Sequence, residues 1–148
     1  MAIETQGMNA ASPTVRWVQW LLLVPGASLA WSVALVSGMA VHSALASLCP
    51  SEQVISGMCT ATWFRYAERI TICAGAGLAA ALILLTSTFI APSHRAIVIV
   101  ATLCIGSAAA LVMGVLAAAY AELATALVVG GQTTVWLLRR DWVRSSER

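Results

Sequence analysis

The chain has 148 residues, of which 60% are hydrophobic and 9% are charged, and its formal net charge is +2. A soluble domain carries roughly 25% charged residues, so this composition leaves too few charges to cover a surface in water. The small net charge supplies no basic stripe for nucleic acid, and we expect no nucleic-acid partner. The composition predicts an integral membrane protein with one domain.

The first predicted elements are a tail and a membrane span. Residues 1–14 are small and polar, and we expect a disordered cytoplasmic tail. The apolar run 17–41 is longer than the roughly 20 residues that a helix needs to cross a bilayer. Ala44–Ala46 resembles a signal-peptide cleavage site, but the apolar run exceeds the roughly 7–15 residues of a signal peptide. We therefore expect a retained span, with Trp31 as a packing residue near its middle.

A polar loop is predicted over 43–69. Cys49 and Cys59 lie close together in it, and we expect a disulfide in an oxidising compartment, with free thiols or a metal or redox site as alternatives. The aromatic side chains of Trp63, Phe64 and Tyr66 follow and are expected at the headgroup level. There they would either dock a partner or anchor the helices. We expect this stretch to continue into the next span as a helical extension or a short interfacial helix.

The second half of the chain is almost free of charge. Between Ile70 and Leu138 only Arg95 and Glu122 are charged at neutral pH. Pro92 ends one apolar stretch, and we divide the next at Tyr120–Glu122, the polar point near its middle. The remaining predicted elements are spans at 70–91, 96–119 and 123–138 and a basic cytoplasmic tail at 141–148.

These elements predict an all-α fold, a four-helix up-down transmembrane bundle within residues 15–140. With both termini in the cytoplasm, only Arg65 and Arg69 of the eight basic residues lie outside, as the positive-inside rule requires. We expect a multi-pass protein of the cell inner (plasma) membrane, with the loop 43–69 on the periplasmic or extracellular side.

Small residues recur at four-residue intervals in every predicted span. This spacing places each set on one helix face and lets two backbones approach closely. Such faces indicate packing within this bundle or contact with another membrane protein. The residues that we select for helix packing are Ala30, Ala34, Gly38, Gly77, Gly106, Ala110, Gly114 and Gly130.

Residues that carry chemistry are scarce. The sequence has no catalytic triad, phosphate loop, metal motif or carboxylate pair, so we expect no enzyme, no catalytic residue, no cofactor and no metal. His42 and Glu122 are both predicted at the outer interface, and they form the best polar pair that the sequence offers. Intramembrane ionisable residues are functional candidates, and the spans contain almost none.

The main functional hypothesis is lateral helix–helix interaction with a membrane-protein partner or a second copy. Such a protein would be an accessory subunit, or an immunity protein against a pore-forming toxin. A small oligomeric transporter or channel is one alternative, with Gln132, Thr133 and Thr134 lining the path. A redox or quinone-site membrane anchor that uses His42 and the outer cysteines is another.

Overall fold

The computed structural model is all-helical and describes residues 13–91 and 95–146. Four helices in it are long and apolar enough to cross a membrane, which confirms the predicted all-α class and the expectation of four such helices. Most of the tail predicted at 1–14, and residues 92–94 and 147–148, lie outside the described residues. The helices are α1 (Pro13–Ser47), α2 (Thr62–Ile90), α3 (Arg95–Leu116) and α4 (Tyr120–Ser146).

α1, α2 and α4 are longer than the predicted spans, whereas α3 ends at Leu116, before the predicted end at 119. α1 continues through Pro25 to Ser47 and α2 begins at Thr62, so the predicted loop 43–69 is shortened from both sides. After Val41 the chain keeps favourable helix formers, and the next strong helix breaker is Pro50. At the other end of the chain, α4 continues into the segment predicted as a tail at 141–148.

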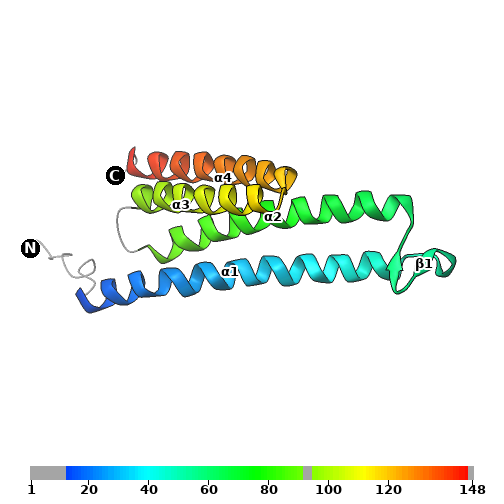
Figure 1. Ribbon diagram of the computed structural model, residues 1–148. Coiled ribbons are helices and arrows are strands. Elements are labelled where there is room, and N and C mark those ends of the chain that lie inside the picture. The colour runs from blue at the N-terminus through cyan, green and yellow to red at the C-terminus, as the bar shows by residue number, and fades with distance from the viewer. Residues whose placement is uncertain (1–12, 92–94, 147–148) are drawn as a thin grey trace, which may run out of the picture.

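α2 is the central helix of the molecule. α1 packs along α2 and makes little contact with the other helices, whereas α4 and α3 pack against another side of α2 (Figure 1). The chain therefore forms two helical hairpins, a long one from α1 and α2 and a short one from α3 and α4. The start of α1, the start of α3 and the end of α4 lie toward the same end of the molecule (Figure 1).

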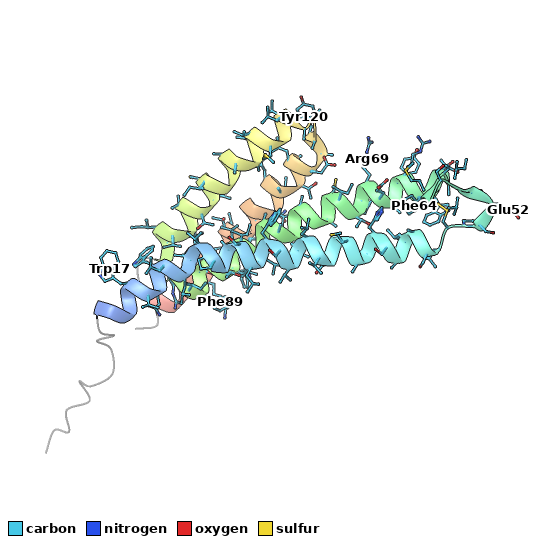
Figure 2. All side chains as sticks on the ribbon, turned by 60° about the horizontal axis from the view of Figure 1, so that its bottom comes forward. Trp17, Glu52, Phe64, Arg69, Phe89 and Tyr120 are labelled. Carbon is cyan, nitrogen blue, oxygen red and sulfur yellow. A yellow bond between two sulfur atoms is a disulfide. The ribbon has the colours of Figure 1, made fainter. Side chains whose placement is uncertain are left out.

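The two hairpins differ in length. The 22 residues of α3 span about 33 Å at ~1.5 Å per residue, close to the ~30 Å of a hydrocarbon core. The 35 residues of α1 span about 52 Å. The excess lies at the far end, where Glu52 and Phe64 extend well past Tyr120 at the α3–α4 turn (Figure 2). The tip of the long hairpin thus projects beyond the short hairpin.

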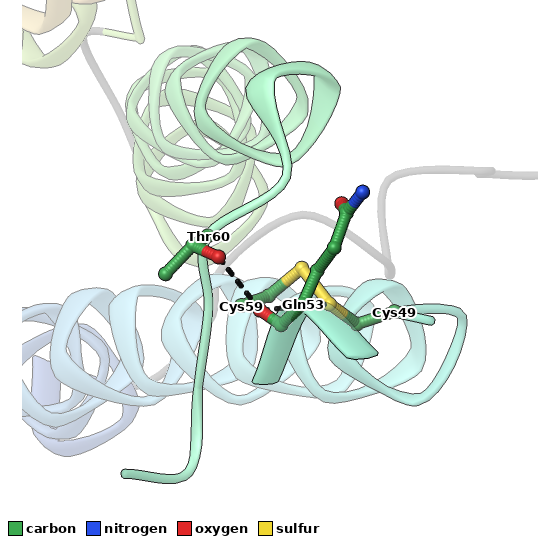
Figure 3. The surroundings of a disulfide bond; sticks show 4 residues. All are labelled: Cys49, Gln53, Cys59 and Thr60. Atoms are coloured by element: carbon green, nitrogen blue, oxygen red, sulfur yellow. Dashed lines mark hydrogen bonds between the residues drawn. A yellow bond between two sulfur atoms is a disulfide. The ribbon is translucent and has the colours of Figure 1, made fainter. Parts of the chain in front are cut away.

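A small disulfide-bonded cap closes the projecting tip. It consists of a 3₁₀ turn (Ser51–Gln53) and an antiparallel pair of two-residue strands, β1 (Val54–Ile55) and β2 (Met58–Cys59). Ser56 and Gly57 both have positive φ, 50° and 78°, as a two-residue type I′ turn requires. Cys49 and Cys59 form the predicted disulfide beside it (Figure 3).

One residue after the disulfide, Thr60 secures the cap. Its backbone N–H and its hydroxyl both donate to the carbonyl of Gln53, at 2.9 and 2.8 Å (Figure 3). The hydroxyl therefore stabilises the disulfide-bonded cap and does not cap the helix. α2 begins after Ala61 without a side-chain hydrogen bond at its N-terminus. The cap joins the ends of α1 and α2 into one unit.

The hydrophobic core lies between α2, α3 and α4. Leu84, Ile99 and Leu137 form its buried cluster, and Leu103 is one of the leucines that pack around it. Among the described side chains, α1 supplies none to this cluster. The three helices thus share one core, and α1 is attached beside it through α2.

The turn between α3 and α4 occupies residues 117–119, slightly before the predicted position at Tyr120–Glu122. Ala118 adopts a left-handed conformation with φ 52°. The N–H of Ala119 donates to the carbonyl of Gly114 at 2.9 Å, and the N–H of Ala118 donates to that of Val115 at 3.3 Å. This is the Schellman pattern that ends many helices, formed here without glycine at the left-handed position. Glu122 consequently lies in the first turn of α4, where a negative charge is favourable.

Candidate functional site: an open groove between the two hairpins

Several of the predicted helix-packing residues are enclosed within the chain. Ala30 and Ala34 of α1 are buried, as are Gly77, Gly114 and Gly130 of the other helices. A Cβ at Gly77 would lie 3.0 Å from Cγ2 of Val129, and one at Gly114 would lie 3.0 Å from Cβ of Leu123. These glycines allow close approach between helices of the same molecule.

The other predicted packing residues face open space. A Cβ added at Gly38 or at Gly106 would meet nothing within 4 Å. Ala110 follows Gly106 on the same face of α3 and is half-buried. The structure therefore divides the small-residue faces into a group packed inside this chain and a group that the chain leaves open.

The open faces line two adjoining cavities. The larger one, about 500 Å³, lies among α2, α3 and α4 and includes Gly106 and Ala110 in its wall. The smaller one, about 430 Å³, lies between α1 and α2 and includes Gly38 in its wall. Four residues line both cavities, which makes the two one continuous groove: Trp31, Ala76, Ala79 and Glu122.

Trp31 and Glu122 are the residues with binding chemistry at the junction of the cavities. Trp31 was expected to pack near the middle of its span, but 52% of its surface is exposed, and it lines the groove. Glu122 reaches the same junction from the first turn of α4. Helix α1 and helix α4 are distant in sequence, so no local sequence signal links these two residues.

His42 has a different partner from the one predicted. Its Nδ1 atom lies 3.9 Å from Oε1 of Glu68, and both side chains are partly exposed. His42 and Glu122 line the same small cavity, but the structure does not bring them within ion-pair distance. The reason is that α2 begins at Thr62, in agreement with the expected helical extension of the second span, and this helix places Glu68 beside His42.

Glu122 has no cationic side chain within 4.0 Å among the described side chains. The ion pair between His42 and Glu68 is the one within 4.0 Å among the described side chains, residues 17–91 and 95–140. An acidic side chain at the junction of two mostly apolar cavities therefore lacks a counter-charge from these residues. An unpaired ionisable side chain in an apolar cavity is a functional candidate.

The three outer aromatic residues have different roles. Phe64 is buried, with its ring edge-on to His42 at 5.7 Å and to Trp63 at 5.8 Å between centroids. It therefore holds α2 against α1 rather than presenting a contact surface. Trp63 and Tyr66 are exposed on the projecting hairpin. Of the predicted docking residues, these two are placed to meet lipid headgroups or a partner.

The residues named for the alternative functions do not meet in one site. Gln132, Thr133 and Thr134 line neither cavity. The hydroxyl of Thr133 donates to the carbonyl of Val129 at 2.8 Å, and the buried hydroxyl of Thr134 has no hydrogen-bond partner. Among the described residues, no group of three or more His, Cys, Asp or Glu side chains could hold a metal ion.

Comparison with protein-family models, curated proteins and solved structures found no match to this chain. Functional arguments therefore rest on the groove itself. The groove offers apolar walls, several positions without side-chain bulk, one aromatic ring and one carboxylate. This combination suits binding by shape and charge.

Proposed function

We propose that this protein acts by lateral contact with another membrane protein and has no catalytic activity. In this proposal the four helices cross the cell inner membrane up and down, with both termini in the cytoplasm and the disulfide-bonded cap on the outer side. The excess of arginines in the predicted inner segments supports this orientation. A disulfide in the cap also favours an oxidising outer compartment.

The observation that carries the proposal is the open small-residue face of α3. Gly106 and Ala110 line the larger cavity, and a side chain at Gly106 would meet no atom of this chain within 4 Å. Helices associate in membranes mainly by close packing, because lipid tails are as apolar as the side chains. A face of small residues that no other helix of the chain covers is therefore a suitable contact surface for a partner helix.

A pair of alanine substitutions on α3 tests this contact. Ala110→Leu places a bulky side chain in the larger cavity, whereas Ala108→Leu makes the same change at an exposed position that lines neither cavity. We expect cross-linking to a membrane partner in native membranes to fall about tenfold or more for Ala110→Leu and to persist for Ala108→Leu. Equal effects of the two substitutions, or no cross-linked species with the unmodified protein, would contradict the proposal.

The cross-linked species also decides between the versions of this function. A stoichiometric complex with a resident membrane protein supports an accessory subunit, and capture of a pore-forming toxin supports an immunity protein. A species of twice the mass of this chain supports a homo-oligomer.

A further inference from the structure

The smaller cavity contains a carboxylate that has no cationic side chain within 4.0 Å among the described side chains. Glu122 is half-buried and enters this cavity from α4, while the remaining wall comes from α1 and α2. The nearest predicted cationic partner, His42, lies at the same cavity but is beside Glu68. The cavity thus has a negative group and no cationic side chain within 4.0 Å of it.

The rest of the wall suits an apolar body. Leu35, Met39 and Ile72 supply aliphatic and thioether surface, and Trp31 supplies an aromatic ring. A cation over a tryptophan face gains about 0.5–2 kcal/mol, the larger value when water is excluded. Calcium or magnesium would want six or more oxygen ligands, and this wall provides a single carboxylate.

We propose that the smaller cavity binds an organic cation with an apolar body, with Glu122 opposing the charge and Trp31 against the cationic group. The volume of about 430 Å³ is within the range of about 300–1,000 Å³ that small-molecule sites occupy. This site goes beyond the proposed partner contact, which uses the α3 wall of the larger cavity. An experiment can therefore disprove the ligand site without disproving the partner contact, and the reverse.

The direct test is binding to the full chain in lipid nanodiscs. The probe is radiolabelled methyltriphenylphosphonium, and triphenylphosphine oxide serves as a neutral molecule of similar size and shape. Binding to empty nanodiscs is subtracted, because both molecules partition into lipid. We expect saturable binding of the cation and binding of the neutral molecule that is about tenfold weaker or more.

Two pairs of substitutions test whether the cation binds at Glu122 and Trp31. Glu122→Gln should weaken binding of the cation about tenfold or more, while Glu68→Gln removes a carboxylate outside both cavities and should leave binding unchanged. Trp31→Leu should weaken binding about three- to tenfold. Trp136→Leu is its control, because Trp136 is equally exposed, at 52%, and lines neither cavity.

Two further variants separate loss of the site from loss of the fold. Glu122→Asp keeps the charge and should retain most of the binding. Gly75→Leu should fill the smaller cavity and abolish binding while the protein remains folded, since a Cβ at Gly75 meets nothing within 4 Å. Equal binding of the charged and neutral probes, unchanged binding by Glu122→Gln, or equal losses for Glu122→Gln and Glu68→Gln would overturn the proposal.

Discussion

Gly75 and Gly77 are two residues apart on α2 and have opposite surroundings. A side chain at Gly77 would meet Val129 and Thr125 of α4, whereas a side chain at Gly75 would enter the smaller cavity. The same contrast separates the whole molecule into a closed region, where α2, α3 and α4 share a core, and an open region, the groove beside α1. Small residues occur in both regions, so their spacing alone does not indicate whether a face is already filled.

The difference arises from how the two hairpins are joined. α1 packs almost entirely against α2, and the short α3–α4 hairpin covers only part of the length of α2. Within the closed region Gly77, Gly114 and Gly130 face side chains of another helix. In the open region the opposing helix is missing, and the groove remains available for a ligand or a partner.

The largest effect is expected in the closed region. Ile99 is 1% exposed at the centre of the core, and Ile99→Ala should lower the free energy of unfolding by about 2–5 kcal/mol because it leaves a cavity. Ile97→Ala on the same helix removes a side chain that is mostly exposed and should change it by less than about 0.5 kcal/mol. Unfolding by SDS in mixed micelles measures both. Similar losses for the two variants would mean that the core is not where the structure places it.

The next effect sharpens the contrast between the two glycines. Gly77→Leu should destabilise the protein by about 1–3 kcal/mol, because Val129 and Thr125 are short branched side chains that cannot move far aside. Gly75→Leu should leave the stability unchanged or raise it slightly, since leucine is the better helix former. The same SDS titration compares them. If Gly75→Leu is the more damaging variant, α2 is rotated relative to its described orientation.

A smaller effect concerns a polar group inside the closed region. The buried hydroxyl of Thr134 has no hydrogen-bond partner, so Thr134→Val should raise the free energy of unfolding by about 1 kcal/mol. Thr133→Val removes a hydroxyl that donates to the carbonyl of Val129 and should bring no such gain. A loss of stability on Thr134→Val would show that this hydroxyl binds something in the membrane.

The smallest effect is expected at the turn that borders the open region. Ala118 has φ 52°, and Ala118→Gly should raise the free energy of unfolding by about 0.5–1 kcal/mol, because glycine adopts this conformation without strain. Ala117→Gly, at a neighbouring residue without positive φ, should instead lower it slightly. Thermal unfolding of the two variants in detergent provides the comparison, and a stabilising Ala117→Gly would contradict the described turn.

Much of the architecture was predictable from local composition. The near absence of charge between Ile70 and Leu138 predicts apolar surroundings and several spans, because a charged side chain is costly in hydrocarbon. The spacing of Cys49 and Cys59 predicts the disulfide that closes the cap. These features depend on residues close together in the chain, and the structure agrees with both.

The helix ends and the last turn were less predictable. The end of α1 and the start of α2 contact each other through His42 and Phe64, and no local pattern indicates which residues meet there. The α3–α4 turn uses Ala118 at a left-handed position where glycine is the usual signal. At the first place the structure depends on a tertiary contact, and at the second on an unusual backbone angle. Neither has a local sequence signal from which it could be predicted.

The sequence by itself determined that the chain has the composition of a membrane protein, how many of its helices are long enough to cross a membrane, and which cysteines form the disulfide. Only the tertiary structure decided which small-residue faces are filled, which acid accompanies His42, and that Trp31 and Glu122 meet at one groove. The physical reason is that hydrophobicity and helix formation depend on neighbouring residues. Burial and cavity lining depend instead on which helix lies opposite, and here those helices are far apart in the chain.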